Sequence, residues 1–174
     1  ASRELARFVR GDCDGRECLV WAVCGAGKTE VVFNALGTVL DRGGKVLYCI
    51  PRRDVVSELA PRIRCAFPGV RVAELHGGLH HDPGEADITV ATTHQALRYY
   101  RHFDLIVLDE VDAYPYRGNR MLHYAVLRAA RESGKIIYMT ATPSPELRGR
   151  VVSGDCSLVT IPVRFHGRPL PVPE

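Results

Sequence analysis

The stretch AVCGAGKTE at residues 22–30 decides the fold of this chain. Its small residues follow the apolar run CLVWAV (18–23) and precede the apolar run VVFNALGTVL (31–40). Small residues between a buried strand and a helix let backbone N–H groups converge on an anion at the helix N-terminus. Glycines permit the backbone conformations and the close approach that this arrangement requires. The stretch therefore predicts a phosphate-binding loop.

Composition and charge are those of an ordinary globular protein. The 174 residues suit one domain, and hydrophobic residues make up 46% and charged residues 25% of the chain. No apolar run approaches the roughly 20 residues that a membrane-spanning helix needs. The first ten residues are amphipathic and charged, unlike a secretory signal peptide. We therefore expect a cytoplasmic protein, and the net charge of +3 does not by itself argue for nucleic acid.

Apolar runs rich in Val and Ile alternate with helical patterns along the chain. We expect strands over 18–23, 45–50, 70–75, 86–92, 103–110, 135–142 and 157–162, and helices over 30–44, 53–67, 94–100, 119–134 and 144–152. Pro61 is expected to kink or split the second helix. Near-continuous apolar strands separated by helices are typical of a mostly parallel sheet with helices on both faces. Such α/β sheets bind ligands at the carboxyl ends of their strands.

The pattern divides the chain into one domain and a short tail. Residues 1–162 contain all the expected strands and helices. Residues 163–174, VRFHGRPLPVPE, contain three prolines and no periodicity, so we expect a linker or an extended tail there.

The chemistry of the loop at residues 25–30 points to ATP and Mg²⁺ as cofactors. Lys28 brings a compact positive charge to the β- and γ-phosphates, and the Thr29 hydroxyl is placed to bind Mg²⁺. Ala22 stands where the pattern G-x-x-x-x-G-K-[ST] has its first glycine, and a small residue there still permits the turn. We predict that the nucleotide is held by Gly25, Ala26, Gly27, Lys28, Thr29 and Glu30.

A second motif is the acidic stretch DEVD at residues 109–112, which follows the most apolar expected strand. Asp109 is placed to hold Mg²⁺ and Glu110 to orient and deprotonate an attacking water. Positioning and charge stabilisation of this kind carry most of the catalysis in phosphoryl transfer. Together with Lys28, Asp109 and Glu110 are the predicted catalytic residues, and Glu110 favours hydrolysis over transfer to a second substrate. Asp112 is placed to link this site to neighbouring motifs.

Three further stretches follow expected strands. The stretch TAT supplies Thr140, Ala141 and Thr142 as candidate coupling residues. Arg52 and Arg53 open a helix, and Thr92 and Thr93 open another. Arginine, hydroxyl and amide groups contact a phosphate backbone without selecting a base sequence. An ordinary helix cap or a solvated arginine accounts equally well for each of these last four residues alone.

In this order the motifs resemble the first RecA-like domain of superfamily 2 helicases and translocases, over about residues 18–145. The stretches WAVCGAGKTE, DEVDAYPY (109–116) and PVRFHGRPLPVP (162–173) resemble the ComFA family of competence ATPases, and more distantly the PriA family. The resemblance implies a RecA-like fold and ATP-driven movement on single-stranded DNA during transformation. It also implies a second RecA-like domain in the parent protein, and competence proteins as partners at the inner face of the membrane.

Two other functions stay open on the sequence alone. A P-loop phosphotransferase would need an acceptor pocket and an arginine-bearing lid, for which Arg117 and Arg120 are the available residues. A non-catalytic ATP-binding module would serve assembly, although the intact Lys28, Asp109 and Glu110 argue against it. We expect weak hydrolysis from this domain alone, because no arginine from a second motor domain completes the site.

Overall fold

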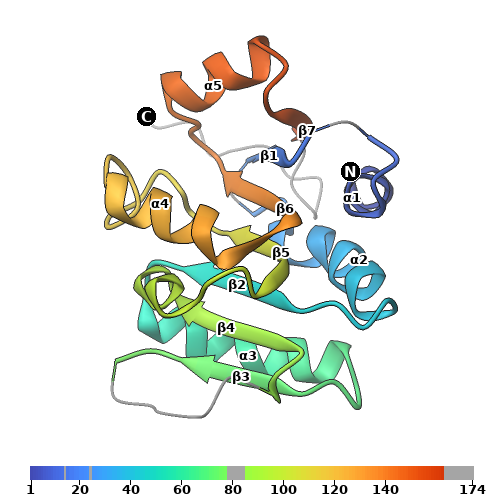
Figure 1. Cartoon of the computed structure of the whole chain (residues 1–174). Helices are drawn as coiled ribbons and strands as arrows, with labels where there is room; N and C mark the ends of the chain where they lie inside the picture. Colours follow the sequence, from blue (N-terminus) through green and yellow to red (C-terminus); the bar gives the residue numbers. More distant parts are fainter. Residues whose placement is uncertain (14, 24, 78–84, 163–174) are drawn as a thin grey trace, which may run out of the picture.

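Seven parallel strands form the framework of the part of the chain that the computed structural model describes, residues 1–13, 15–23, 25–77 and 85–162 (Figure 1). Their order across the sheet is β3-β4-β2-β5-β6-β1-β7, and every adjacent pair is parallel. The strands are β1 (Glu17–Ala22), β2 (Val46–Ile50), β3 (Val72–Leu75), β4 (Ile88–Thr92), β5 (Phe103–Leu108), β6 (Ala130–Thr140) and β7 (Ser157–Ile161). The expected α/β class with a parallel sheet is confirmed.

Helices cover both faces of the sheet, as the apolar strands predicted (Figure 1). On one face lie α1 (Ser2–Arg10), α2 (Lys28–Leu40) and α3 (Arg53–Ala66), and on the other lie the 3₁₀ helix η2 (Thr93–Arg98), α4 (Arg120–Ala129) and α5 (Pro145–Val152). Each face buries its own apolar cluster. None of the helices in the described residues is long and apolar enough to cross a membrane.

Successive side chains of a strand point to opposite faces of the sheet, so they belong alternately to the two clusters. In β2, Val46, Tyr48 and Ile50 pack against the first set of helices, whereas Leu47 and Cys49 pack against the second. All five residues of β2 are buried. A strand buried on both faces holds its two ends rigidly, which fixes the starting points of the loops that follow it.

Helix α1 was not among the expected elements. Its Leu5, Phe8 and Val9 are buried in the cluster that includes α2, and Gly11 ends the helix in the left-handed region at φ 88°. The spacing of three and four residues is a helical signal. The amphipathic character of the first ten residues thus marks a helix of the fold, which the expected elements did not include.

The expected helix over 119–134 is wrong at its C-terminal end. Helix α4 ends at Ala129, and β6 runs from Ala130 to Thr140 with Ala130 paired to Phe103. A Cβ at Gly134 would lie 2.8 Å from the Phe103 carbonyl oxygen, so only glycine lets the strands approach this closely. Pairing to β5 overrides the local helical preference of the segment.

Pro61 does not split α3, which is continuous from Arg53 to Ala66. Proline removes one backbone donor, but the buried Val56, Leu59 and Ile63 hold the helix on the sheet from both sides of it. The expected tail over 163–174 lies outside the described residues.

Candidate functional site

The predicted site residues follow the carboxyl ends of five adjacent strands. Across the sheet these strands are β4, β2, β5, β6 and β1. The residues at or just beyond these ends are, in the same order, Thr92 and Thr93, Arg52 and Arg53, Asp109 to Asp112, Thr140 to Thr142, and Gly25 to Glu30. Residues scattered over the sequence thus share one edge of the sheet, because parallel strands end on the same side.

The loop after β1 has the backbone geometry of an anion-binding turn. Gly25 and Gly27 have φ of 76° and 69°, which side chains other than glycine adopt only with strain. Gly27 is the N-cap of α2 and Lys28 its first residue, and no side chain of a described residue caps the helix. The first N–H groups of α2 are therefore free to bind an anion, which fits a phosphate at this position.

Tyr48 links the two predicted magnesium ligands. Its hydroxyl donates to Asp109 Oδ2 at 3.4 Å, and the Thr29 side chain hydrogen-bonds to the same phenol. Tyr48 lies fully buried in β2, next to β5 in the sheet, and burial together with the Asp109 carboxylate raises its pKa well above the usual value. A neutral phenol that holds one carboxylate oxygen fixes the Asp109 side chain beside Thr29. These oxygen ligands fit Mg²⁺.

Burial raises the pKa of Asp109, and the positive charge of Lys28 opposes this shift. The second carboxylate oxygen, Oδ1, accepts from the Glu110 backbone N–H at 2.9 Å. A buried carboxylate with a cation close by is arranged to receive a divalent ion, because the ion offsets the desolvation of the charge.

Glu110 lies in a tight turn and is exposed. Its φ of 52° is unusual for a residue other than glycine, and its carbonyl accepts from Ala113 N–H at 2.9 Å. The chain thus turns two residues after β5 ends at Leu108, and the Glu110 side chain is exposed to solvent. Strained backbone of this kind clusters at functional positions.

Asp112 joins the acidic motif to the TAT stretch. Its Oδ1 accepts from the fully buried Thr140 hydroxyl at 2.6 Å, and its Oδ2 accepts from the Thr142 hydroxyl. Burial acts to raise the pKa of Asp112, but the two hydroxyl bonds, a backbone hydrogen bond and the charge of Lys28 together lower it. Thr142 N–H also donates to Thr140 Oγ1 at 2.9 Å. Displacement of Asp112 would therefore move Thr140 and Thr142 with it.

Comparison with known proteins identifies the family. The model of the DEAD/DEAH box helicase family matches residues 6–149. The chain belongs to the DEAD/DEAH box helicase family. This makes it a helicase-family ATPase domain, and the nucleotide that such domains bind, ATP with Mg²⁺, fits the loop, Thr29 and Asp109 described above.

Individual relatives agree with the family match. The helicase domain is 43% identical to the competence protein ComFA of Bacillus subtilis over 158 residues, which is 91% of this chain and 34% of that protein. It is 25% identical to the replication restart protein PriA of the same organism, over 88% of this chain and 21% of PriA. The chain thus spans about a third of ComFA and about a fifth of PriA. A hypothetical ATP-dependent RNA helicase of Sulfolobus tokodaii superposes with a TM-score of 0.70 at 24% identity, over 93% of this chain and 51% of that structure, which supports the fold.

Glu30, predicted to help hold the nucleotide, forms an ion pair with Arg62 of α3 in the helicase domain. Both side chains are about half exposed. The pair links the first turn of α2 to α3, and thus the phosphate loop to the helix that begins with Arg53.

The predicted polynucleotide contacts occupy the β4 and β2 end of the edge. Arg52 is exposed and forms a two-point ion pair with Asp54, with Nε to Oδ1 at 3.2 Å. The hydrogen bonds that Arg52 donates to Asp54 raise the pKa of Arg52, and the Glu110 charge adds to this shift. Arg53 is exposed, whereas Thr92 and Thr93 are 8% and 2% exposed. Arg53 therefore presents its charge at the surface of this edge, whereas the two threonines lie below the surface.

The sequence did not reveal Trp21 or Tyr48 as members of the site. Trp21 Nε1 donates to the Ala141 carbonyl at 3.1 Å, so β1 is tied to the TAT stretch through a side chain. Register places Trp21 opposite Thr140. Apolar residues inside strands carry no signal of function, and only the sheet order brings them to the site.

A cavity of about 390 Å³ lies behind the acidic motif, between α4 and α5. It is lined by residues that include Val111, Asp112, Tyr116, His123, Tyr138 and Arg150. At its base, Glu17 Oε2 accepts from the Tyr138 hydroxyl at 2.6 Å and pairs with Arg150 at 2.7 Å. Tyr116 is 5% exposed and stacks on His123 with ring centroids 4.2 Å apart. These contacts tie α5 to β1 and β6, and the loop that follows DEVD to α4.

Proposed function

We propose that this domain is the ATP-hydrolysing motor domain of a DNA translocase that moves single-stranded DNA during natural transformation. The observation that carries the proposal is Asp112, whose carboxylate accepts hydrogen bonds from the hydroxyls of both Thr140 and Thr142. An ATPase that only bound nucleotide would have no need to join its acidic motif to an adjacent strand end. The 43% identity to ComFA, named a competence protein, supports transformation as the setting.

Each residue of the site has a defined part in hydrolysis. Bound Mg–ATP supplies the phosphoanhydride to be cleaved and a cation that neutralises charge on its phosphates. Lys28 and the first N–H groups of α2 would hold the phosphates, and Thr29 and Asp109 would hold the cation. Glu110 orients a water molecule towards the terminal phosphate and accepts its proton.

The proposal includes partners that the domain does not contain. A second RecA-like domain of the same protein supplies an arginine to the terminal phosphate, and such a residue accelerates hydrolysis by orders of magnitude. Alone, residues 1–162 hydrolyse ATP weakly. The working protein acts in the cytoplasm, at the inner face of the membrane, with other competence proteins.

The test is phosphate release by the intact protein with no polymer, single-stranded DNA, duplex DNA or RNA. We expect strong stimulation by single-stranded DNA, and Lys28→Ala should abolish both nucleotide binding and stimulation. Equal rates with and without every polymer would contradict the translocase function. ADP accompanied by a phosphorylated metabolite would identify a phosphotransferase, and nucleotide binding without release of phosphate would identify an assembly module.

A further inference from the structure

We propose that a second cavity, at the edge of the sheet opposite the phosphate loop, binds the phosphate group of a phosphate monoester. We call it the amino-edge cavity and define it by Arg10, Arg42, Asp104, Arg131 and Lys135, which line it. None of these residues belongs to the predicted ATP site. The inference goes beyond the proposed function and does not depend on it, because it assigns a ligand that is neither the nucleotide nor DNA.

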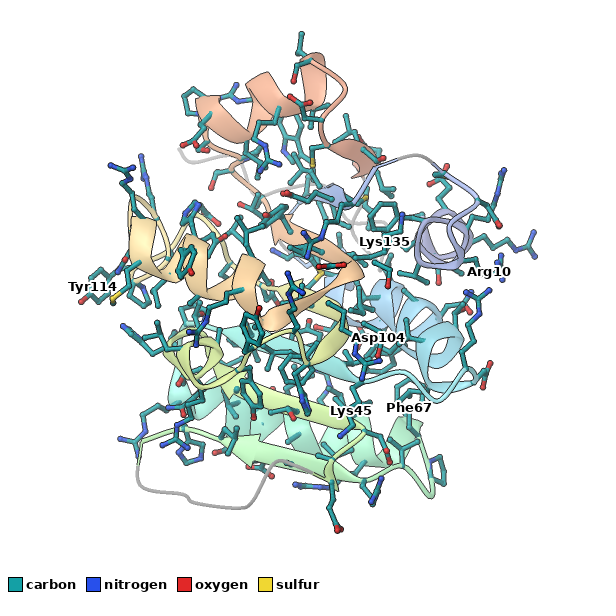
Figure 2. All side chains as sticks on the ribbon, in the orientation of Figure 1. Arg10, Lys45, Phe67, Asp104, Tyr114 and Lys135 are labelled. Carbon is teal, nitrogen blue, oxygen red and sulfur yellow. The ribbon has the colours of Figure 1, made fainter. Side chains whose placement is uncertain are left out.

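The amino-edge cavity lies far from the acidic motif. It has a volume of about 390 Å³ and lies where α1 and α2 end and where β2 and β5 begin. Parallel strands begin on the same side of a sheet, so this edge is opposite to the edge where the ATP site lies. Figure 2 shows Arg10, Lys135 and Asp104 on the side of α1 and α2, away from Tyr114 in the loop after DEVD. A ligand in this cavity would therefore not compete with ATP.

Four cations and one carboxylate line the cavity among the described residues. Arg10 pairs with Asp12 at 3.3 Å, just outside the lining. The lining carboxylate, Asp104, accepts from Arg131 through both oxygens, at 2.9 and 3.1 Å. Asp104 Oδ2 also accepts from the Lys45 backbone N–H at 2.8 Å. The fold thus neutralises this carboxylate, which removes the main source of repulsion for an anion in the cavity.

Arg42 and Lys135 carry the charge that the fold leaves over. No carboxylate of a described residue pairs with either side chain. Arg42 Nη1 donates to the Arg10 carbonyl at 3.5 Å. Lys135 Nζ donates to the Gly15 carbonyl and lies 4.9 Å from the centroid of the Phe8 ring. These neutral partners position the two cations but leave both charges without a counter-ion in the described part of the chain.

Two positive charges match a phosphate monoester better than other anions. A phosphate monoester carries a charge of about −1.5 to −2 at pH 7, whereas a carboxylate or a phosphodiester carries a single charge. Arg42 offers a planar fork for two-point binding, and Lys135 offers a compact charge. The Ser133 hydroxyl, which also lines the cavity, adds a donor. Val9 and Val39 give the cavity an apolar wall, which suits the carbon atoms attached to the phosphate.

The test measures binding of inorganic phosphate to the intact protein by isothermal titration calorimetry. Saturating adenylyl imidodiphosphate with Mg²⁺ first fills the nucleotide site, so that phosphate cannot bind at the loop before α2. Arg42→Ala and Lys135→Gln should each weaken phosphate binding by about tenfold or more, the effect of losing one hydrogen bond from a charged donor. An absence of binding in the wild type, or an affinity that neither variant changes, would overturn the inference.

Control variants separate the site from general charge and from stability. Arg148→Ala is the matched control, because Arg148 is an exposed arginine of α5, on the other face of the sheet, and no carboxylate of a described residue pairs with it. Arg42→Lys keeps the charge but loses the fork, so its affinity should lie between those of the wild type and Arg42→Ala. Arg42 is exposed beyond the C-terminus of α2, so its variants should fold and decide the test even if Lys135→Gln melts early.

Two phosphate monoesters distinguish the sources of the ligand. Displacement of inorganic phosphate by glycerol 3-phosphate would support a small organic phosphate. Binding to vesicles that contain phosphatidic acid, weakened by Arg42→Ala and absent with phosphatidylglycerol, would support a lipid headgroup. Binding of inorganic phosphate without either ester would overturn the assignment of a monoester.

Oligo(dT) tests the alternative of a general polyanion surface. If oligo(dT) displaces inorganic phosphate as well as glycerol 3-phosphate does, at equal concentrations of phosphate groups, the cavity does not select a monoester and the inference is overturned. None of these measurements depends on stimulation of the ATPase by single-stranded DNA. The inference and the proposed function can therefore fail separately.

Discussion

The two ends of the functional edge are built differently. At β5, β6 and β1, carboxylates are fixed by buried partners, as Asp109 is by Tyr48 and Asp112 by Thr140. Among the described residues at β4 and β2, the charged side chains are exposed and lack buried partners. Arg52, for example, pairs with Asp54, two residues away. Hydrolysis needs atoms that are held in place, whereas the proposed movement along DNA needs contacts that bind and release. We expect substitutions to cost most at the fixed end and least at the exposed end.

The largest effect is expected at Glu110. Glu110→Gln keeps the size of the side chain but removes the base, so kcat should fall by about 10²–10⁴-fold while nucleotide affinity is retained. Phosphate release and titration with a fluorescent ATP analogue measure the two quantities. Glu146→Gln, an exposed acid on α5, serves as the control. If Glu110→Gln hydrolyses ATP at the normal rate, Glu110 is not the base, and the end of the edge at β5, β6 and β1 is not the site of hydrolysis.

Thr140→Val should damage the connection between the two ends. The substitution keeps the shape of a fully buried side chain but leaves Asp112 without one donor and Thr142 N–H without its acceptor. Leaving such partners unsatisfied costs about 1–3 kcal/mol, and stimulation by single-stranded DNA should fall relative to the basal rate. Thermal melting and phosphate release test both effects. Thr160→Val, at an exposed position of β7, should change neither, and a fully stimulated Thr140→Val enzyme would contradict the coupling role.

The two aspartates should affect stability with opposite signs. The folded pKa of Asp109 is raised by burial, so its ionised form destabilises the native state near neutral pH and this cost disappears as pH falls through the raised pKa. Asp109→Asn should therefore raise Tm by about 2–4 °C at about pH 7, the shift for about 1 kcal/mol in a chain of this size. The gain should shrink in acid.

Asp112 provides the contrasting case. Its folded pKa is lowered, so its contribution to stability is present above the ordinary value of an aspartate and is lost as pH falls through the lowered pKa. Asp112→Asn should therefore lower Tm near neutral pH, with a smaller loss in acid. Melting curves of both variants between about pH 7 and about pH 3, without Mg²⁺ or nucleotide, compare them directly. Shifts of the same sign would show that burial does not dominate at Asp109.

The smallest effects are expected at the exposed arginines. Arg52→Ala and Arg53→Ala should each weaken single-stranded DNA binding several-fold and lower the salt slope by about one, without changing sequence preference. Arg42→Ala, an exposed residue just beyond the C-terminus of α2, is the control. A loss as large as that of Glu110→Gln would show that this end of the edge is as constrained as the other.

The same contrast explains what the sequence could predict. Strand ends, glycines and the GKT and DEVD motifs are local patterns, so the parallel fold and the positions of Lys28, Thr29, Asp109 and Glu110 were accessible from them. Tyr48 and Trp21 were not, because their role depends on which strands are neighbours. The C-terminal end of α4 was missed for a related reason, since the pairing of Ala130 with Phe103 is a contact between segments that are distant in sequence.

Trp21 gives the molecule an optical signal of its own. It is the single tryptophan of the chain, it is 37% exposed, and its indole N–H binds the Ala141 carbonyl at the centre of the TAT stretch. Indole emission responds to hydration and to hydrogen bonding, so rearrangement of that stretch should change the intensity or colour of the fluorescence. Stopped-flow mixing with ATP or single-stranded DNA would then time the step that couples the two ends of the edge, with no added label.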